Sequence, residues 1–202
     1  MDWLLYENEC INSGYNLVCG VDEAGRGPLA GPVFAASVIL PVNTVIEGVN
    51  DSKKISEKKR ETLFEIIKQK AVAYSIAYST EEEIDEINIL NATFLAMSRA
   101  VHGLKPKPDI ALIDGNKAPE LNIPTRCIIK GDAKSQSIAA ASILAKVSRD
   151  RLMKEMSIKY PEYQFEKHKG YGTALHRELI KKYGYCPIHR KTFLKKILVD
   201  CK

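Results

Sequence analysis

The sequence predicts an α/β protein with one main domain and a helical region at its C-terminal end. Short apolar or β-rich runs alternate with longer segments of helical spacing, and the runs end in glycine, proline or acidic residues that favour turns. The chain has 202 residues, which is enough for one well-buried core. Its hydrophobic fraction of 45% and charged fraction of 27% are typical of a soluble globular protein.

The first two predicted strands flank a pair of acids. Residues 18–21 form an apolar run that leads into Asp22 and Glu23, and a turn rich in glycine and proline follows. Residues 33–40 form the second β-rich run, which ends at Pro41. Asp22 and Glu23 are therefore expected where a strand meets a tight turn.

The glycines of this turn allow a second interpretation. Gly25-x-Gly27 could belong to a dinucleotide-binding loop, but that loop joins a strand to a helix whose N-terminus meets the pyrophosphate. Here Pro28 and Pro32, with β-favouring residues after them, predict another strand. An acidic pair before the loop would also repel a phosphate unless a cation lay between them. A plain turn with a solvated acidic pair is the simplest alternative.

The next segment contains a loop, a helix and a strand. Lys53 and Lys54 precede a helix that begins near Ser56, whose hydroxyl can cap it. The two lysines could hold a phosphate or could be ordinary surface residues, and the charge pattern does not distinguish these roles. Residues 71–79 alternate in hydrophobicity and predict the third strand.

A capping box at residues 80–83 predicts the start of a second helix. Apolar residues then recur at helical spacing up to Gly103. We interpret the acidic triplet in this box as capping residues and not as a metal site.

Two further predicted strands also end in acids. Residues 109–115 predict a buried strand with Asp114 near its end, and residues 125–130 predict a strand that is followed by Asp132 and a long helix. Asp-Gly and Gly-Asp are ordinary turn dipeptides, so each acid alone would be structural more often than not. Three strand ends that carry acids in a βαβ-like order instead suggest a common site.

The C-terminal part of the chain is predicted to be helical and is basic. Residues 168–173 form a compact loop, Thr173 can cap a helix that ends before Gly184, and residues 192–199 predict a final short helix. Residues 146–202 contain 15 Lys and Arg against 6 Asp and Glu, a local charge of +9. This charge suggests a polyanionic partner such as nucleic acid, although charge runs usually mark a solvated face.

Targeting and cysteine signals point to a cytoplasmic protein. No segment is long and apolar enough to span a bilayer, and residues 1–10 lack the basic and then apolar profile of a secretory signal. The five cysteines are odd in number, widely spaced and never in a Cys-x-x-Cys pair, which predicts reduced thiols. We expect Cys19 and Cys127 to be core residues inside strands.

The stretch from residue 20 to residue 33 resembles the opening motif of the ribonuclease HII family. It reads Gly20-Val21-Asp22-Glu23-Ala24-Gly25-Arg26-Gly27-Pro28-Leu29-Ala30-Gly31-Pro32-Val33. Further family-like motifs at residues 51–54, 112–115, 130–151 and 168–173 extend the resemblance over nearly the whole chain. The short interval between Asp114 and Asp132 resembles the bacterial branch of these type 2 ribonucleases H.

The resemblance implies a ribonuclease H-like fold, in which helices flank a five-stranded mixed sheet and a helical extension follows at the C-terminus. The type 2 ribonuclease H domain would occupy residues 16–202 and include the C-terminal helical region. Residues 1–15 would form an N-terminal segment.

The resemblance also implies a metal-dependent site at Asp22, Glu23, Asp114 and Asp132, which would be both catalytic and metal-binding. Carboxylates at such a site would repel one another unless cations neutralised them. Oxygen ligands without histidine or thiolate select hard ions, so Mg²⁺ or Mn²⁺ is the expected cofactor. Two ions roughly 4 Å apart, with substrate bound, would activate a water and stabilise the leaving oxygen of a phosphodiester.

The implied activity is endonucleolytic hydrolysis of the RNA strand of RNA–DNA hybrids and cleavage 5′ to single ribonucleotides embedded in duplex DNA, leaving 3′-hydroxyl and 5′-phosphate ends. These nucleic acids are the expected partners of a monomer. The substrate-binding residues implied by the resemblance are Gly25, Arg26, Gly27, Lys53, Lys146, Lys169 and Tyr171. The glycine turn would contact the 2′-hydroxyl largely through its backbone. Tyr171 would pack at the RNA–DNA junction, unless it is a core tyrosine.

Two alternatives on the same fold are a non-catalytic hybrid-binding module and a nuclease that acts on DNA only. The presence of all four acids argues against the first, and the Gly25-Arg26-Gly27 turn argues against the second. The sister family, ribonuclease HIII, usually has lysine where this chain has Arg26.

Overall fold

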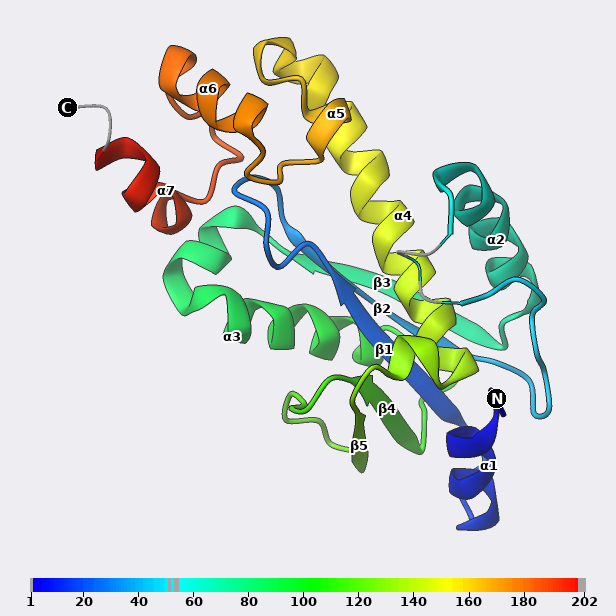
Figure 1. The fold of residues 1–202 in the computed structure, drawn as a ribbon. Helices are drawn as coiled ribbons and strands as arrows, with labels where there is room; N and C mark the ends of the chain where they lie inside the picture. Colours follow the sequence, from blue (N-terminus) through cyan, green and yellow to red (C-terminus); the bar gives the residue numbers. More distant parts are fainter. Residues whose placement is uncertain (1, 51, 53–54, 200–202) are drawn as a thin grey trace.

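The computed structural model describes residues 2–50, 52 and 55–199, and its centre is a five-stranded mixed sheet (Figure 1). The strands are β1 (Val18–Ala24), β2 (Val33–Ile39), β3 (Ala73–Ser79), β4 (Ile110–Asp114) and β5 (Thr125–Ile128). Their order across the sheet is β3-β2-β1-β4-β5. β1 pairs antiparallel with β2 and parallel with β4, and β4 pairs parallel with β5. The predicted five-stranded mixed sheet is confirmed.

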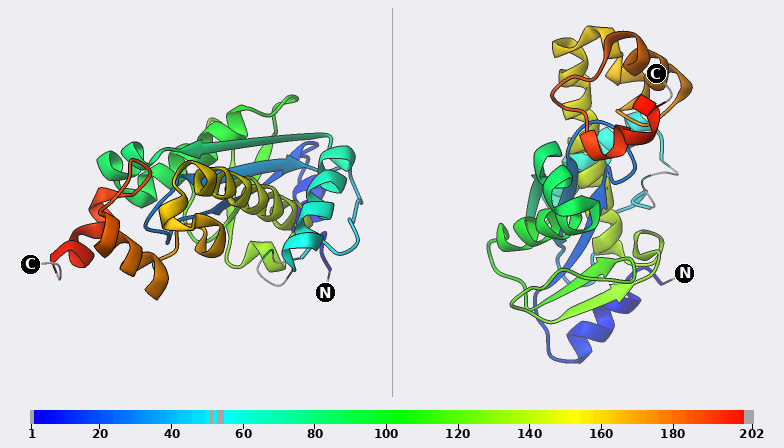
Figure 2. Two further views of the ribbon diagram at one scale, coloured as in Figure 1. Left: turned by 90° about the horizontal axis from the view of Figure 1, so that it is seen from above. Right: turned by 90° about the vertical axis from the view of Figure 1, so that its left-hand side faces the viewer.

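Helices cover both faces of this sheet, and Figure 2 shows α3 and α4 on opposite sides of it. The α-helices are α1 (Leu5–Asn12), α2 (Glu57–Lys70), α3 (Glu81–His102), α4 (Gln136–Lys159), α5 (Phe165–His168), α6 (Ala174–Tyr183) and α7 (Lys191–Val199). Two short 3-10 helices, η2 (Gly131–Ala133) and η3 (Pro161–Tyr163), flank α4. Every residue of β2 is buried, because side chains on both of its faces pack against helices.

The predicted helix starts are confirmed by their hydrogen bonds. Thr80 and Glu83 form both bonds of the capping box at the start of α3. The Ser56 hydroxyl accepts a bond from the Lys59 N–H at the start of α2, and Thr173 caps α6. Local side-chain signals therefore set where these three helices begin.

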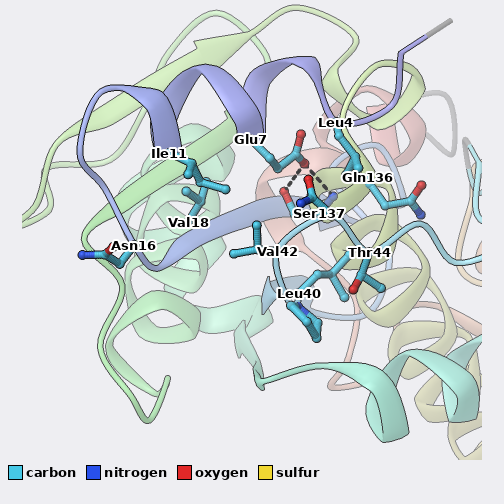
Figure 3. A pocket seen from close by; sticks show the side chains of 12 residues that line it. Leu4, Glu7, Ile11, Asn16, Val18, Leu40, Val42, Thr44, Gln136 and Ser137 are labelled. Atoms are coloured by element: carbon cyan, nitrogen blue, oxygen red, sulfur yellow. Dashed lines mark hydrogen bonds between the residues drawn. The ribbon is translucent and has the colours of Figure 1, made fainter.

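The N-terminal helix α1 is attached to the start of α4 (Figure 3). The buried Glu7 carboxylate accepts hydrogen bonds from the Ser135 hydroxyl at 2.6 Å, the Ser137 hydroxyl at 2.7 Å and the Ser137 N–H at 2.9 Å. Acidic groups are favourable at helix N-termini, where backbone N–H groups lack partners. α1 lies within the predicted N-terminal segment and helps to fix the N-terminal end of α4.

The C-terminal helices form the extension that the sequence predicts. Tyr163, Phe165, Leu179 and Leu194 are buried together and pack against Met153 of α4. No helix in the described part of the chain is long and apolar enough to cross a membrane.

Two details differ from the predictions. β1 continues through Ala24, so Asp22 and Glu23 lie inside the end of the strand and not beyond it. Cys19 is buried as expected, but Cys127 is exposed. The reason is that β5 is an edge strand and only its last residue is buried, so a strand position that looks apolar in the sequence does not become a core position there.

Candidate metal centre and substrate cleft

The carboxyl ends of two parallel strands bring the first two acids together. The register of β1 and β4 pairs Val21 with Ile113. The next residue on each strand is an aspartate, so Asp22 and Asp114 lie side by side at one edge of the sheet. Asp22 is buried, and its Oδ1 accepts a hydrogen bond of 2.7 Å from the Glu23 N–H.

A glycine in β1 allows the third acid to approach. A Cβ added at Gly20 would lie 2.2 Å from the backbone carbonyl carbon of Ser137 in the first turn of α4. Only glycine permits so close a contact between this strand and this helix. The η2 turn, which carries the buried Asp132, directly precedes α4, and its Gly131 N–H donates to Asp114 Oδ1 at 2.6 Å.

Asp22, Asp114 and Asp132 thereby form one cluster. A carboxylate oxygen from each lies within 4.8 Å of the others, and this is the one group of three or more potential metal ligands among the described residues. Glu23, the fourth predicted acid, is outside this group. Its carboxylate instead pairs with Arg26 at 3.3 Å.

Burial and repulsion disfavour the charged forms of these acids. Burial raises the pKa of Asp22 well above its ordinary range, and the charges of Glu23 and Asp114 raise it further, while a hydrogen bond from Ser142 offsets part of the increase. Burial also raises the pKa of Glu23, although Arg26 acts in the opposite direction. A bound cation would remove this repulsion and favour the ionised carboxylates.

The ligand atoms of the cluster fit a hard divalent cation. All three are carboxylate oxygens, and the group contains no histidine or thiolate. Mg²⁺ and Mn²⁺ prefer such ligands. The cluster is therefore suited to the class of metal that the sequence predicts.

In the presence of a chelator, Asp22→Asn should raise the free energy of unfolding by on the order of 1 kcal/mol. The substitution removes a buried charge that is repelled by Glu23 and Asp114, and the amide oxygen can still accept the bond from the Glu23 N–H. The folded-state pKa of Asp22 is raised, so its charge becomes destabilising as the pH rises through that pKa. The increase in the free energy of unfolding that Asp22→Asn causes should therefore be larger at about pH 8 than at about pH 4.

Urea denaturation of both proteins in EDTA measures this difference in stability. A variant that is no more stable than the wild type at about pH 8 would contradict charge repulsion at Asp22. Added Mn²⁺ should stabilise the wild type more than the variant, because the variant lacks one anionic ligand.

The carboxylate cluster adjoins a cleft of about 220 Å³. The cleft is lined by Asp22, Glu23, Ala24, Gly25, Arg26, Gly27, Ser52, Ser142, Lys146 and Tyr171. The structure thus brings the predicted glycine turn, one predicted lysine and the predicted tyrosine to the same cleft as two of the predicted acids.

Tyr171 lies in the loop after α5, with 43% of its surface exposed. The alternative that it is a core tyrosine is therefore wrong. His168 Nδ1 accepts a hydrogen bond from the Gly170 N–H and thereby helps to fix the loop. The Arg149 guanidinium carbon lies 5.8 Å from the centre of the Tyr171 ring. The ring is thus held against a cation and remains accessible from the cleft.

The three predicted substrate-binding lysines have different positions. Lys146 lines the cleft, and its Nζ donates to Asp150 at 2.7 Å. The Nζ of Lys169 donates to the Glu166 carbonyl, and Lys169 is not among the residues that line the cleft. Lys53 lies outside the described residues.

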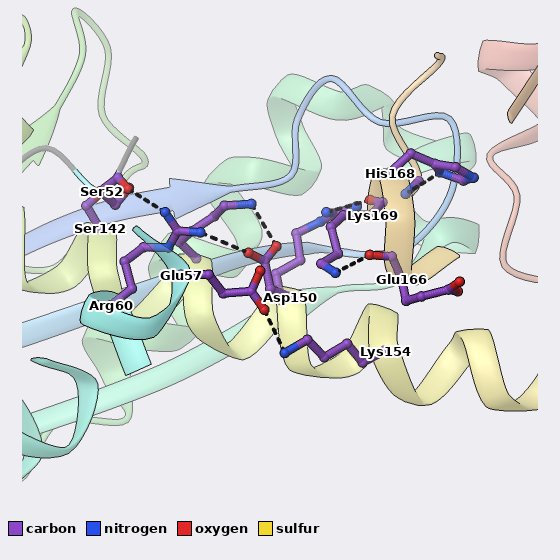
Figure 4. A network of polar contacts seen from close by, with 12 residues as sticks. Ser52, Glu57, Arg60, Ser142, Asp150, Lys154, Glu166, His168 and Lys169 are labelled. Atoms are coloured by element: carbon purple, nitrogen blue, oxygen red, sulfur yellow. Dashed lines mark hydrogen bonds and ion pairs between the residues drawn. The ribbon is translucent and has the colours of Figure 1, made fainter. Parts of the chain in front are cut away.

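A polar network joins the segment before α2 to α4 beside the cleft (Figure 4). The hydroxyl oxygens of Ser52 and Ser142 are 2.9 Å apart, and Arg60 donates to the Ser52 carbonyl at 2.9 Å. Arg60 also pairs with Asp150 at 3.7 Å, and the same carboxylate accepts the bond from Lys146. Ser52 is therefore anchored to two helices at the edge of the cleft.

Three residues that hold the cleft together are not predicted as site residues from the sequence: Ser142, Arg149 and Arg190. Ser142 is a hydroxyl in the otherwise apolar run 138–145, and a polar residue in such a run was a usable signal. Arg149 and Arg190 belong to the basic C-terminal region of the sequence, but both are fully buried. Nothing in the local sequence distinguishes them from the solvated arginines that are usual there.

Known proteins resemble this chain over nearly its whole length. The family model described as Ribonuclease HII matches residues 19–196. A ribonuclease HII from Caldicellulosiruptor bescii is 62% identical over 192 residues, which cover 95% of this chain and 93% of that protein.

Solved structures have the same fold. The ribonuclease H2 from Pyrococcus horikoshii OT3 superposes with a TM-score of 0.77 at 29% identity, over 92% of this chain and 99% of that chain. The Bst ribonuclease HIII, solved in complex with Mn²⁺, superposes with a TM-score of 0.71 at 18% identity, over 92% of this chain and 70% of that chain. The predicted ribonuclease H-like fold is thereby confirmed. The family match over most of the sequence establishes that the chain belongs to the ribonuclease HII family of endonucleases.

Proposed function

We propose that the protein hydrolyses the RNA strand of RNA–DNA hybrids and cleaves duplex DNA on the 5′ side of single embedded ribonucleotides, leaving 3′-hydroxyl and 5′-phosphate ends. One observation carries this proposal: a cluster of carboxylates adjoins a cleft that also contains a glycine turn and an exposed tyrosine. The carboxylates supply a site for hydrolysis. The turn and the tyrosine supply groups that distinguish a ribose from a deoxyribose.

In this proposal Asp22, Asp114 and Asp132, together with Glu23, hold Mg²⁺ or Mn²⁺. Two bound ions, present together with substrate, supply an activated water and stabilise the leaving oxygen. The protein fixes the carboxylates in advance, because backbone N–H groups hold the Asp22 and Asp114 side chains. Little reorganisation is then needed when a cation and a phosphate arrive.

The remaining residues of the cleft would bind the nucleic acid. Gly25, Arg26 and Gly27 follow the acids after a single residue, Ala24, and line the same cleft, so their backbone can reach the sugar beside the scissile phosphate. Lys146 would contact a phosphate from the same cleft. Lys53 and Lys169 are also proposed to bind phosphates of the nucleic acid. We propose that the protein acts as a monomer in the cytoplasm.

A cleavage assay on three duplexes of one sequence tests the function. The first contains one ribonucleotide, the second is an RNA–DNA hybrid, and the third is entirely DNA. We expect cleavage of the first two only when Mg²⁺ or Mn²⁺ is present, with the cut on the 5′ side of the ribonucleotide. Comparable cleavage of the third duplex would favour a nuclease for DNA. Binding of the hybrid without cleavage in either metal would favour a non-catalytic module.

Affinity for a hybrid should fall as the salt concentration rises. Residues 146–202 carry a net charge of +9, and contacts of lysine or arginine with phosphates release counterions. The logarithm of the association constant should decrease by about 0.9 for each unit of log salt and each phosphate contact. Fluorescence anisotropy in EDTA, between about 50 and 200 mM salt, measures this slope without cleavage. A dissociation constant that does not change over this range would contradict phosphate binding by the basic region.

A further inference from the structure

The turn between β1 and β2 is held from inside the protein by two arginines. Arg149 of α4 and Arg190, which directly precedes α7, are both fully buried. Arg149 donates to the carbonyls of Ala30 at 3.0 Å and Pro32 at 3.1 Å, in the second half of the turn. Its third bond, of 2.9 Å, goes to the Lys169 carbonyl and links the turn to the loop of Tyr171.

Arg190 binds mainly the first half of the turn, which follows the acids in the sequence. Its Nη2 donates to the Gly25 carbonyl at 2.6 Å, and its Nη1 donates to the carbonyls of Arg26 at 2.9 Å and Pro28 at 2.8 Å. Its Nε donates to the Gly31 carbonyl at 2.8 Å. One rigid guanidinium group therefore fixes several peptide groups at once.

This arrangement is unusual for a buried charge. The bonds from the Arg190 side chain go to backbone carbonyls. Burial, with a smaller contribution from the nearby Arg149, lowers its pKa to about 9. Arg190 is still mainly protonated at neutral pH, so the protein retains a desolvated charge at this position. A desolvated charge is costly, and here the bonds from the same guanidinium to four carbonyls of the turn offset that cost. The buried charge and the backbone conformation of the turn therefore depend on each other.

The geometry of the peptide bond shows what is positioned. A trans peptide is planar, and its C=O and N–H groups point in opposite directions. Because Arg190 binds the carbonyls of Gly25 and Arg26, the N–H groups of Arg26 and Gly27 point away from Arg190. In the described part of the chain, neither N–H donates a hydrogen bond, and both residues line the cleft.

The C-terminal segment is attached to the turn by its backbone as well. The Arg190 N–H donates to the Leu29 carbonyl at 2.9 Å, and the Gly31 N–H donates to the Ile188 carbonyl at 2.8 Å. Gly25 has a φ of +99°, and a Cβ there would lie 2.1 Å from Arg149 Nε. The turn thus has little freedom to move relative to either arginine.

We propose that Arg190 is a positioning residue for ribose recognition: it orients the N–H groups of Arg26 and Gly27 into the cleft, where both can donate to the 2′-hydroxyl of a ribonucleotide. Arg190 itself touches no substrate. The inference rests on the proposed function, since it concerns the same cleft, and it assigns to the C-terminal extension a part in substrate selection.

Arg190→Lys tests this role. Lysine retains the positive charge, but it lacks the rigid fork that reaches the Gly25 and Arg26 carbonyls together. The measurement is the ratio of two dissociation constants in EDTA, one for an all-DNA duplex and one for the same duplex with a single ribonucleotide. The wild type should bind the ribonucleotide duplex more tightly than the all-DNA duplex. In the variant the ratio of the two dissociation constants should be roughly tenfold smaller, as expected when one or two hydrogen bonds are lost.

A merely structural role would leave this ratio unchanged, because partial unfolding weakens the binding of both duplexes by the same factor. Arg99→Lys is the matched control, since Arg99 also donates to a backbone carbonyl, that of Tyr78, outside the residues that line the cleft. Its ratio should equal that of the wild type. An unchanged ratio in Arg190→Lys, or an equal loss in Arg99→Lys, would overturn the inference.

Hydrogen exchange in the wild-type protein provides a second test, which does not depend on whether the variant folds. The Arg26 and Gly27 amides should exchange more slowly with the ribonucleotide duplex bound than with the all-DNA duplex bound. Equal exchange would overturn the inference, even if the protein prefers and cleaves the ribonucleotide duplex as proposed. A wild type that shows neither preference nor cleavage would instead refute the proposed function, and the inference with it.

Discussion

Asp114→Asn should lower metal-dependent cleavage at least about a thousandfold, while hybrid binding in EDTA stays measurable. Asp114 contributes one of the three clustered carboxylate oxygens, and the substitution removes its negative charge. Metal ions in such sites supply several kcal/mol of transition-state stabilisation, which depends on the anionic ligands that hold them. The asparagine oxygen can still accept the bond from the Gly131 N–H, so the local backbone should not change.

Asp109→Asn is the matched control for this experiment. Asp109 directly precedes β4, at the opposite end of the strand from Asp114, and accepts bonds of 2.9 Å from the N–H groups of Asn16 and Leu17. The same chemical change there should leave turnover close to that of the wild type. Initial rates with Mn²⁺ and dissociation constants in EDTA separate catalysis from binding. Normal turnover in Asp114→Asn, or an equal loss in both variants, would show that the cluster is not the catalytic centre.

The parts of the site that the sequence predicts are those with a local cause. Asp22 and Asp114 each come after an apolar run, and parallel strands place their carboxyl ends at one edge of the sheet. Thr80 and Glu83 are three residues apart, so the capping box can be recognised in a short window. In each case the residues that interact are neighbours in sequence, or their strands are neighbours in a simple topology.

The parts that the sequence did not predict depend on contacts between distant segments. Arg190 and Gly25 are 165 residues apart, and Glu7 and Ser135 are 128 residues apart. No periodicity or turn signal relates such pairs. The prediction that Cys127 is a core residue is wrong for a related reason, since its exposure depends on the place of β5 at the edge of the sheet. The order of the strands across the sheet is a property of the whole fold and cannot be recognised from one strand's sequence.

Tyr171→Ala should reduce cleavage at a single ribonucleotide far more than cleavage of a continuous RNA strand paired with DNA. The Tyr171 ring is exposed at the cleft and lies near the Arg149 guanidinium, so it offers a flat face to the sugar next to the scissile site. By analogy with base–aromatic contacts, the stacking is worth about 1 to 3 kcal/mol, or roughly tenfold to a hundredfold in rate. A lone ribonucleotide has a deoxyribose beside it, whereas a continuous RNA strand presents a ribose at every position.

The ratio of kcat/KM values on these two substrates measures the effect, and two further variants separate its causes. Tyr171→Phe keeps the ring and should keep the ratio of the wild type, because the expected contact involves the face of the ring and not the hydroxyl. Tyr185→Ala removes another tyrosine of the C-terminal region, which is 51% exposed and does not line the cleft, and it should change neither rate. Equal losses on both substrates in Tyr171→Ala would make Tyr171 a general binding residue. Recognition of the junction would then have to come from another group in the cleft, such as Lys146.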